Sequence, residues 1–214
     1  MESGEFQTFL SKVASRLRHD LKGGLITLKM GLESLPDEEA LKPLLLEKSQ
    51  ELVDLSDKLV LLLRMGQLAP QKVRPTSLFQ QAANQARSLY PPLEVVVEAA
   101  EGLEDSWRVD PDAVTYAVLE ICQNSQLAGA KRVEVQLRPG GLVSLRNDGR
   151  GLEEGVDADK LTQVGVSFWD RSGLGLAVVE RCMEEHSGKV ELERGQTGFT
   201  INLRFADQNL EETI

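Results

Sequence analysis

Two leucine-rich stripes with helical spacing fill the first third of the chain. Their members recur every three or four residues, which places them on one face of a helix. Between the stripes, Pro36-Asp37-Glu38-Glu39 combines a turn residue with acids that favour the start of a helix. The stripes therefore predict a helical hairpin over about residues 5–35 and 38–66. The first stripe consists of Leu10, Val13, Leu17, Leu21, Leu25, Leu28, Leu32 and Leu35, and the second of Leu41, Leu45, Leu52, Leu55, Leu59 and Leu62, with Lys48 interrupting it.

A hairpin of two helices has only a thin hydrophobic core of its own. A leucine seam of this length is typical of helices that pair with a second copy, as in four-helix bundles. We therefore expect residues 1–68 to form one half of a dimeric four-helix bundle.

The pattern changes after residues 66–75, which contain one glycine and two prolines and are typical of a linker. Beyond them, helical and alternating segments are mixed, and Pro139-Gly140-Gly141 gives a hairpin signal. This order predicts an α+β protein in which residues 73–206 form an α/β sandwich and 207–214 form a tail. Helices are expected at 77–89, 111–128 and 173–185, and strands at 93–98, 132–137, 142–146, 190–193 and 199–205.

Charge and hydropathy exclude several classes of function. The net charge of −10 is the opposite of what a broad nucleic-acid-binding surface requires. No apolar run approaches the ~20 residues of a membrane span, so we expect no such span and a cytoplasmic location. Cys122 and Cys182 lie in apolar helical patterns and are expected to be buried thiols.

His19, one of two histidines, lies two residues from both Leu17 and Leu21. At about 100° per residue, it therefore points away from the leucine stripe and toward solvent. An isolated exposed histidine is usually an ordinary surface residue, but Asp20 can accept its second ring proton and sharpen the other nitrogen as a nucleophile. The basic neighbours suited to stabilising a phosphoryl group are Arg16, Arg18 and Lys22.

Glu120 and Asn124 are four residues apart in a strongly predicted helix, so they share one face. A carboxylate and an amide oxygen one turn apart can hold Mg²⁺ and position a nucleophile. Taken alone, the pair fits the polar stripe of an amphipathic helix equally well.

Two glycine-rich stretches follow. Asp148 comes directly after a predicted strand, where it can accept a hydrogen bond from the exocyclic amine of a purine, while Gly149 and Gly151 let the backbone approach the base. The segment from Arg171 through Gly173 to Gly175 opens a helix, whose N-terminal N–H groups suit a phosphate chain. Each stretch alone is a weak signal, and their order along the chain is what gives them weight.

Taken in order, these motifs resemble those of two-component sensor histidine kinases over nearly the whole chain. RHDLKGGL resembles the H box, Glu120–Ser125 the N box, and Asp148–Gly151 and Ser172–Leu176 the two glycine boxes. Phe168 resembles the short F box. The resemblance implies a dimeric hairpin that carries a phospho-accepting histidine, joined to an ATP-binding α/β sandwich.

The same resemblance implies a role for each residue. His19 would accept the phosphoryl group with Asp20 as its acidic partner, Asn124 would bind Mg²⁺, and Asp148 would read adenine. Glu120 occupies the position of a catalytic glutamate in the related gyrase and mismatch-repair ATPases, and is a second candidate for contact with the metal. The residues expected to frame the nucleotide and its lid are Gly149, Gly151, Gly173 and Gly175.

The sequence departs from the family at several positions. Gly24 replaces a frequent proline, so we expect any bend of the helix there to come from flexibility. Gly23 replaces the Thr or Asn with which bifunctional members orient a hydrolytic water. Leu127 replaces a basic residue that commonly contacts phosphate, and we expect Arg171 to supply that contact instead.

The leading interpretation is an ATP-dependent histidine kinase that uses Mg²⁺, phosphorylates His19 and passes the phosphoryl group to an aspartate on a response regulator receiver domain. The expected partners are that receiver and a second copy of the chain. The sequence leaves open whether a separate sensor or input protein supplies a signal. The alternative is an ATP-independent phosphotransferase that carries phosphate between receiver domains. A pure binding module is a third class, but it has no need of an exposed histidine on a leucine hairpin.

Overall fold

A computed structural model describes residues 68–151, 161–163, 173–195 and 197–206, together with scattered helical residues between 9 and 52. The chain divides into two compact units. One comprises Met1–Arg64 and Val164–Leu174, and the other Met65–Gln163 and Gly175–Ile214. Each unit is described by itself below.

In the first unit, every described residue between 9 and 30 and between 43 and 52 is α-helical. Val13 from the first stripe is buried, and Leu45 and Leu52 from the second are half-buried. A Cβ placed on Gly24 would lie 3.3 Å from Cδ2 of Leu52, so the two helical segments touch at this point. The rest of the hairpin lies outside the described residues, and its pairing with a second copy stays a prediction.

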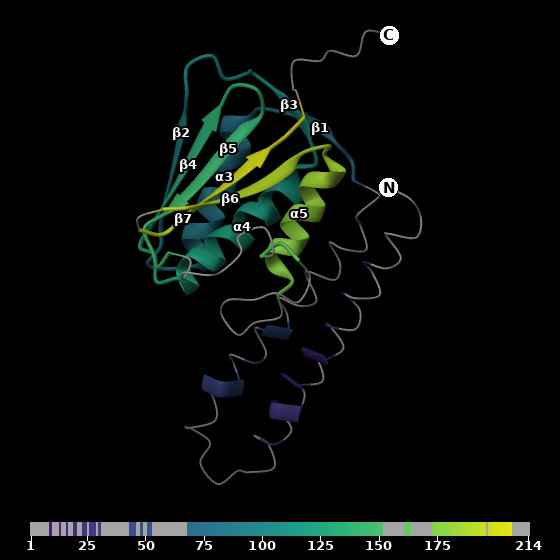
Figure 1. Cartoon of the computed structure of the whole chain (residues 1–214), viewed down its shortest axis with the longest axis vertical. Coiled ribbons are helices and arrows are strands. Elements are labelled where there is room, and N and C mark those ends of the chain that lie inside the picture. Colours follow the sequence, from purple (N-terminus) through teal and green to yellow (C-terminus); the bar gives the residue numbers. More distant parts are fainter. Residues whose placement is uncertain are drawn as a thin grey trace. The chain divides into compact units, whose positions relative to one another are not determined.

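The second unit is built on a five-stranded mixed sheet (Figure 1). Its strand order is β2-β4-β5-β7-β6, with β2 parallel to β4 and the other neighbours antiparallel. Three helices cover one face, which makes the α/β sandwich that the sequence predicted (Figure 1). The strands are β2 Glu94–Ala99, β4 Arg132–Arg138, β5 Leu142–Asn147, β6 Lys189–Arg194 and β7 Phe199–Arg204, and the helices are α3 Pro75–Leu89, α4 Pro111–Leu127 and α5 Gly175–Glu185.

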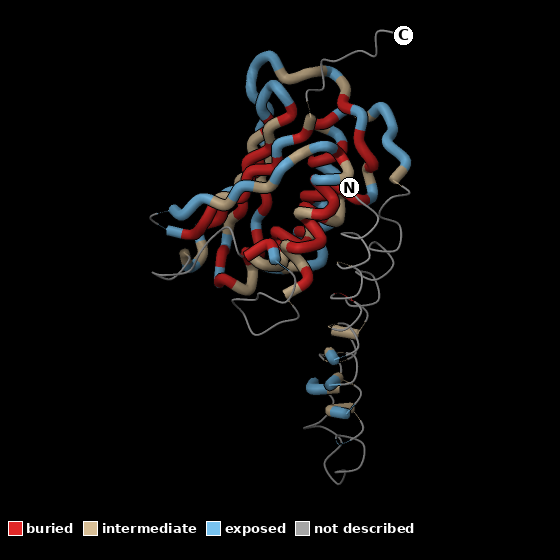
Figure 2. Tube along the Cα trace, turned by 45° about the vertical axis from the view of Figure 1, so that its right-hand side comes forward, coloured by how far each residue is buried: buried red, intermediate tan, exposed pale blue. Residues whose placement is uncertain are grey.

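The core lies between the sheet and its helices, where Figure 2 shows most of the buried residues. Along β4, Val133, Val135 and Leu137 are buried and alternate with less buried polar residues, as a half-buried strand requires. On α3, Ala82, Ala83 and Ala86 are fully buried, so this helix can approach its neighbours closely. The alternation in the sequence therefore translates directly into one covered and one open face of the sheet.

A short second sheet corrects the expectation that residues 66–75 form an irregular linker. Strand β1 (Gln71–Val73) pairs antiparallel with β3 (Trp107–Val109), another strand that was not expected. Trp107 is 1% exposed and packs edge-on against Phe79 and at a tilt against Phe205, with ring centroids 6.0 and 5.5 Å away. The β1–β3 pair thereby attaches the start of this unit to its aromatic core.

Asp110 joins three parts of the second unit. Its Oδ1 caps α4 by accepting hydrogen bonds from the backbone N–H groups of Asp112 and Ala113, 3.1 and 3.0 Å away, and its Oδ2 accepts one from Ala69 at 3.0 Å. Its own N–H donates to Nε2 of His186, 2.9 Å away. The other ring nitrogen of His186 lies 2.7 Å from the carbonyl oxygen of Cys182 on α5. His186 is therefore a buried structural residue that connects the end of α5 to the start of α4.

The cysteines are buried and free, as the sequence suggested. Burial raises the pKa of each thiol, Cys122 and Cys182, to about 12, so both are protonated and unreactive at neutral pH. Among the described residues, no helix is long and apolar enough to cross a membrane.

Candidate functional site

Glu120 and Asn124 lie on the same face of α4, as their spacing predicted. Glu120 is 7% exposed, and its Oε1 accepts a hydrogen bond of 2.7 Å from the hydroxyl of Tyr116. A Cβ built on Gly175, the first residue of α5, would clash with Oε2 of Glu120 and would lie 3.7 Å from Nδ2 of Asn124. The structure therefore brings together the acid, the amide and the N-terminus of α5.

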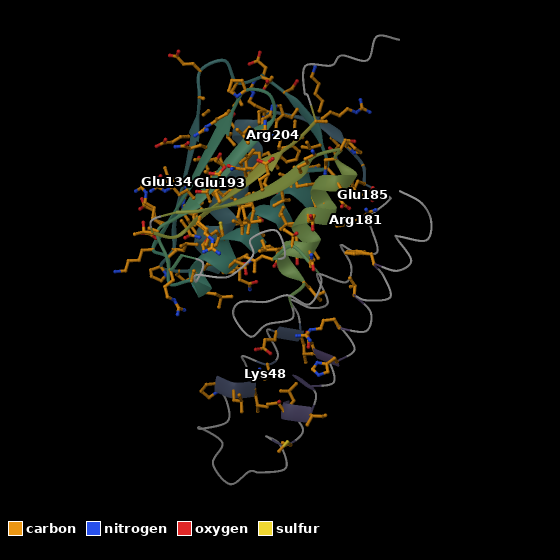
Figure 3. All side chains as sticks on the ribbon, viewed as in Figure 1. Lys48, Glu134, Arg181, Glu185, Glu193 and Arg204 are labelled. Atoms are coloured by element: carbon orange, nitrogen blue, oxygen red, sulfur yellow. The ribbon has the colours of Figure 1, made fainter. Side chains whose placement is uncertain are left out.

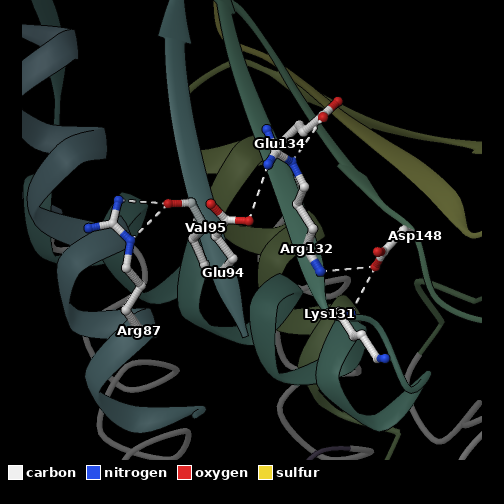
Figure 4. Close-up of polar contacts among 7 residues, drawn as sticks. All are labelled: Arg87, Glu94, Val95, Lys131, Arg132, Glu134 and Asp148. Atoms are coloured by element: carbon white, nitrogen blue, oxygen red, sulfur yellow. Dashed lines mark hydrogen bonds and ion pairs between the residues drawn. The ribbon is translucent and has the colours of Figure 1, made fainter. Parts of the chain in front are cut away.

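Asp148 lies at the end of β5 and is held by the backbone (Figure 4). Its Oδ1 accepts hydrogen bonds from the N–H groups of Lys131 and Arg132, 2.8 and 2.9 Å away. Partial burial works against ionisation of this carboxyl group, but these N–H groups, Asp148's own N–H and the charge of Lys131 outweigh it. The net effect lowers the pKa of Asp148 below its ordinary value, so the site presents a fixed carboxylate.

The side chain of Arg132 is engaged elsewhere. It pairs with Glu94 and Glu134, each 3.1 Å away on the sheet (Figure 4). Only its backbone N–H serves Asp148.

Gly149 is required by packing against the protein's own backbone, and Gly151 also lies close to backbone atoms. A Cβ on Gly149 would lie 2.9 Å from both the carbonyl oxygen of Ala128 and the nitrogen of Ala130, at the end of α4. A Cβ on Gly151 would lie 3.1 Å from the carbonyl oxygen of Gly198. The structure thus gives a packing reason for glycine here, and the expected role of these residues beside a base stays a prediction.

Asn147 and Ser125 form a supporting network that the sequence did not reveal. The buried Asn147 side chain donates from Nδ2 to Oγ of Ser125 at 3.1 Å, and its Oδ1 accepts from the N–H of Gly149 at 3.1 Å. Ser125 in turn donates to the carbonyl of Ile121, 2.8 Å away on α4. The loop that carries Asp148 is thereby tied to the helix that carries Glu120. The only signal in the sequence was that Asn147 begins NDGRG and Ser125 ends the predicted box on α4.

Part of the predicted site lies outside the described residues, namely Phe168 and Arg171. Gly173 is described, and its φ of +63° is one that glycine adopts without strain. Its expected role in a nucleotide lid stays a prediction, as does the phosphate contact expected of Arg171.

His19 and Asp20 belong to the first unit. Nδ1 of His19 lies 3.0 Å from Oδ1 of Asp20, and Nε of Arg16 lies 3.5 Å from Oδ2 of Asp20. The His19 side chain is 78% exposed, so its other nitrogen is accessible to a reactant. A carboxylate only accepts hydrogen bonds, so it favours the tautomer with the proton on Nδ1 and a lone pair on Nε2.

The described residues contain no cluster of three or more His, Cys, Asp or Glu side chains that could hold a metal ion by themselves. Glu120 and Asn124 nevertheless offer oxygen atoms of the kind that Mg²⁺ prefers, and Mg²⁺ commonly takes its remaining ligands from phosphates and water. The donor set thus fits an ion that arrives with a nucleotide.

A separate groove of about 310 Å³ lies on the open face of the sheet. Glu134, Glu193 and Arg204 are among its lining residues and are labelled in Figure 3. Within it, Ser144 donates a 2.7 Å hydrogen bond to Asn202, which donates one of 2.7 Å to Glu193. The groove is on the face opposite the helices, so it does not coincide with Glu120 and Asn124.

Comparison with known proteins agrees with this fold. Residues 109–208 match the family of histidine kinase-, DNA gyrase B- and HSP90-like ATPases. The chain has the fold of a two-component sensor histidine kinase. The matched segment of this histidine-kinase fold contains Glu120, Asn124 and Asp148.

Three solved histidine kinases illustrate the likeness. The Acinetobacter baumannii histidine kinase AdeS has a TM-score of 0.68 and 17% identity, over 89% of this chain and 98% of its own. Histidine kinase ThkA, in complex with the response regulator TrrA, has a TM-score of 0.77 and 16% identity, over 99% of this chain and 65% of its own. The ATP-binding domain of PrrB from Mycobacterium tuberculosis has a TM-score of 0.51 and 25% identity, over 64% of this chain and 97% of its own. No curated protein sequence matches the chain.

Proposed function

We propose that the protein is an ATP-dependent histidine kinase that phosphorylates His19 and then transfers the phosphoryl group to an aspartate of a response regulator. The observation that carries the proposal is the pairing, in one chain, of an exposed His19 bonded to Asp20 with a histidine-kinase-type ATPase domain whose Asp148 is a fixed carboxylate. A chain that only bound nucleotide would not need the exposed histidine. A chain that only carried phosphate would not need the ATPase domain.

In this proposal the second unit binds ATP through side chains from α4 and the end of β5 and through backbone N–H groups of α5. Asp148, anchored through Oδ1, accepts a hydrogen bond from the exocyclic amine of adenine. Asn124 and Glu120 on α4 face the N-terminus of α5, whose N–H groups and dipole favour the phosphate chain. Mg²⁺, held by Asn124 with Glu120 as second candidate ligand, would neutralise phosphate charge when bound.

The lone pair on Nε2 of His19 attacks the γ-phosphorus. A phosphorus–nitrogen bond forms while the bond from that phosphorus to the β–γ bridging oxygen breaks, and ADP leaves with the electron pair. The proton stays on Nδ1, where the Asp20 carboxylate stabilises the positive charge that develops on the ring. In the second reaction, a carboxylate oxygen of the receiver aspartate attacks the same phosphorus, and the electron pair of the broken bond returns to Nε2.

Exposed apolar side chains near His19 support a protein partner for this step. Ile26 and Met30 are 47% and 61% exposed, and they follow His19 by 7 and 11 residues, on the same side of a helix. A receiver that binds this side of the helix at His19 can cover these side chains as well. The solved complex of ThkA with TrrA supports a response regulator as that partner.

Incubation with γ-labelled ATP and Mg²⁺ tests the proposal. We expect acid-labile, base-stable label on the wild-type protein, none on His19→Gln, and at least a roughly tenfold weaker ATP affinity for Asp148→Asn. The matched control is Asp105→Asn, which removes another exposed carboxylate from the same unit and is expected to label normally. An unlabelled wild-type protein that does not bind ATP would reject the kinase and favour the phosphotransfer carrier, which should then take label from a phosphorylated receiver.

A further inference from the structure

Tyr116 lies one helical turn before Glu120 on α4 and is half-buried. Its hydroxyl donates to Oε1 of Glu120 at 2.7 Å, a short distance that is typical of a bond to a carboxylate. No motif in the sequence marks Tyr116, since a tyrosine four residues before an acid is an ordinary helical pair.

The bond matters because Glu120 is buried. A carboxylate that is 7% exposed has lost most of its water and depends on protein donors for its orientation. The two oxygens of Glu120 face different elements, Oε1 toward Tyr116 on α4 and Oε2 toward Gly175 at the start of α5. With Oε1 fixed by the phenol, Oε2 is directed at the helix terminus where the phosphates of ATP are proposed to lie.

We propose that Tyr116 is a positioning residue for phosphoryl transfer, acting through Glu120; the inference rests on the proposed kinase function. Tyr116 holds the Glu120 carboxylate in the orientation in which Oε2 faces the N-terminus of α5. There it is the second candidate ligand for Mg²⁺ beside the phosphates of ATP. Without the phenol, the carboxylate loses one of the donors that orient it, and fewer of its conformers direct an oxygen at the phosphates. Asp148 is anchored by the N–H groups of Lys131 and Arg132, so its proposed recognition of adenine does not use Tyr116.

Tyr116→Phe isolates the hydroxyl, because phenylalanine keeps the ring and its packing. In autophosphorylation assays over a range of ATP concentrations, we expect the maximal rate to fall roughly tenfold, as suits the loss of one hydrogen bond to a charged group. The KM for ATP and the melting temperature should stay close to those of the wild-type protein. The matched control is Tyr90→Phe, which removes the chain's other phenol hydroxyl from the end of α3 and should leave the rate unchanged.

A double-mutant cycle decides whether Tyr116 acts through Glu120. Glu120→Ala removes the acceptor and lowers the rate by itself, and adding Tyr116→Phe to it should cost nothing further. The inference is overturned if Tyr116→Phe matches the wild-type rate, if it slows the Glu120→Ala enzyme by the same factor, or if it raises KM and lowers the melting temperature together. Should the wild-type protein take no label on His19, the proposed function fails and this inference falls with it. If the wild-type protein is labelled and Tyr116→Phe matches it, the inference alone fails.

Discussion

At the scale of single residues, Asp148 shows how backbone groups can fix and ionise a side chain. Two main-chain N–H groups orient the carboxylate before any ligand arrives, and they keep it ionised. A preorganised acceptor loses little conformational entropy on binding. An ionised carboxylate only accepts hydrogen bonds, so in the proposed site it would favour an amine over a carbonyl on a purine.

The lowered pKa of Asp148 predicts a pH dependence of stability. The folded protein holds this proton less tightly than the unfolded chain, so the ionised carboxylate stabilises the fold above the ordinary aspartate pKa of about 3.9. That contribution is lost as the pH falls through the lower pKa of the folded state. Urea unfolding of wild-type protein and Asp148→Asn should therefore differ by a constant amount above about pH 5.5 and converge in more acidic solution.

Asp105→Asn serves as the control for this measurement, because it reports the general effect of removing one surface carboxylate. A difference between wild-type protein and Asp148→Asn that persists unchanged to about pH 3 would contradict the role given to the backbone N–H groups.

At the scale of elements, α4 depends on its N-terminal cap. Asp110→Ala removes acceptors for the N–H groups of Asp112, Ala113 and Ala69, and we expect it to lower the free energy of unfolding by about 2 kcal/mol. The amides of Ala69 and Ala113 should also exchange hydrogen faster. Asp112→Ala, in the exposed first turn of the same helix, should cost only a few tenths of a kcal/mol. Equal losses for the two variants would contradict the capping role.

The adjacent glycines of the first unit make a second prediction at this scale. A Cβ on Gly23 meets no atom within 4 Å, so Gly23→Ala should stabilise its helix by up to about 1 kcal/mol. Gly24→Ala should gain clearly less or lose stability, because its Cβ would crowd Leu52. Thermal unfolding followed by helical circular dichroism compares the two variants. If Gly24→Ala were as stable as Gly23→Ala, the close approach of Leu52 would be unimportant.

Long helices and strands were predicted from the sequence more accurately than short ones. Helices α3 and α4 and strands β4 and β5 were predicted within one or two residues, because each carries a clear period and ends at proline, glycine or a cap. Strands β1 and β3 were missed because they have three residues each, and their pairing of Gln71 with Val109 joins segments far apart in sequence. Spacing placed Glu120 and Asn124 on one face, but only tertiary structure brings Gly175 to them or joins Asn147 to Ser125.

At the scale of the whole molecule, His19, the proposed phospho-acceptor, and the segment that matches the ATPase family lie in different compact units. In the proposed kinase, the first unit would serve both as substrate and as dimer interface. The predicted leucine seam would supply that interface, with half-buried Leu45 and Leu52 available to a second copy.

We expect light scattering after size-exclusion chromatography to give twice the 23.6 kDa mass of the chain. Leu45→Asp should reduce it to one chain by placing a charge in the seam. Leu89→Asp makes the same change at a leucine that is 59% exposed on α3, and it should remain dimeric. If the wild-type protein at micromolar concentration has the mass of one chain, the seam is not a dimer interface. Nucleotide binding by Leu45→Asp would show that its second unit has stayed folded.

The contact between Gly175 and the Glu120 carboxylate also bears on how this sequence can diverge. Any side chain at position 175 would displace Oε2, and a flexible glutamate can give way at little cost to the fold, so the glycine matters for the orientation of the acid at position 120. Positions 120 and 175 are therefore expected to change together during evolution. In a descendant that had lost the proposed phosphoryl transfer, neither residue would be constrained any longer, and side chains larger than glycine would be expected at position 175.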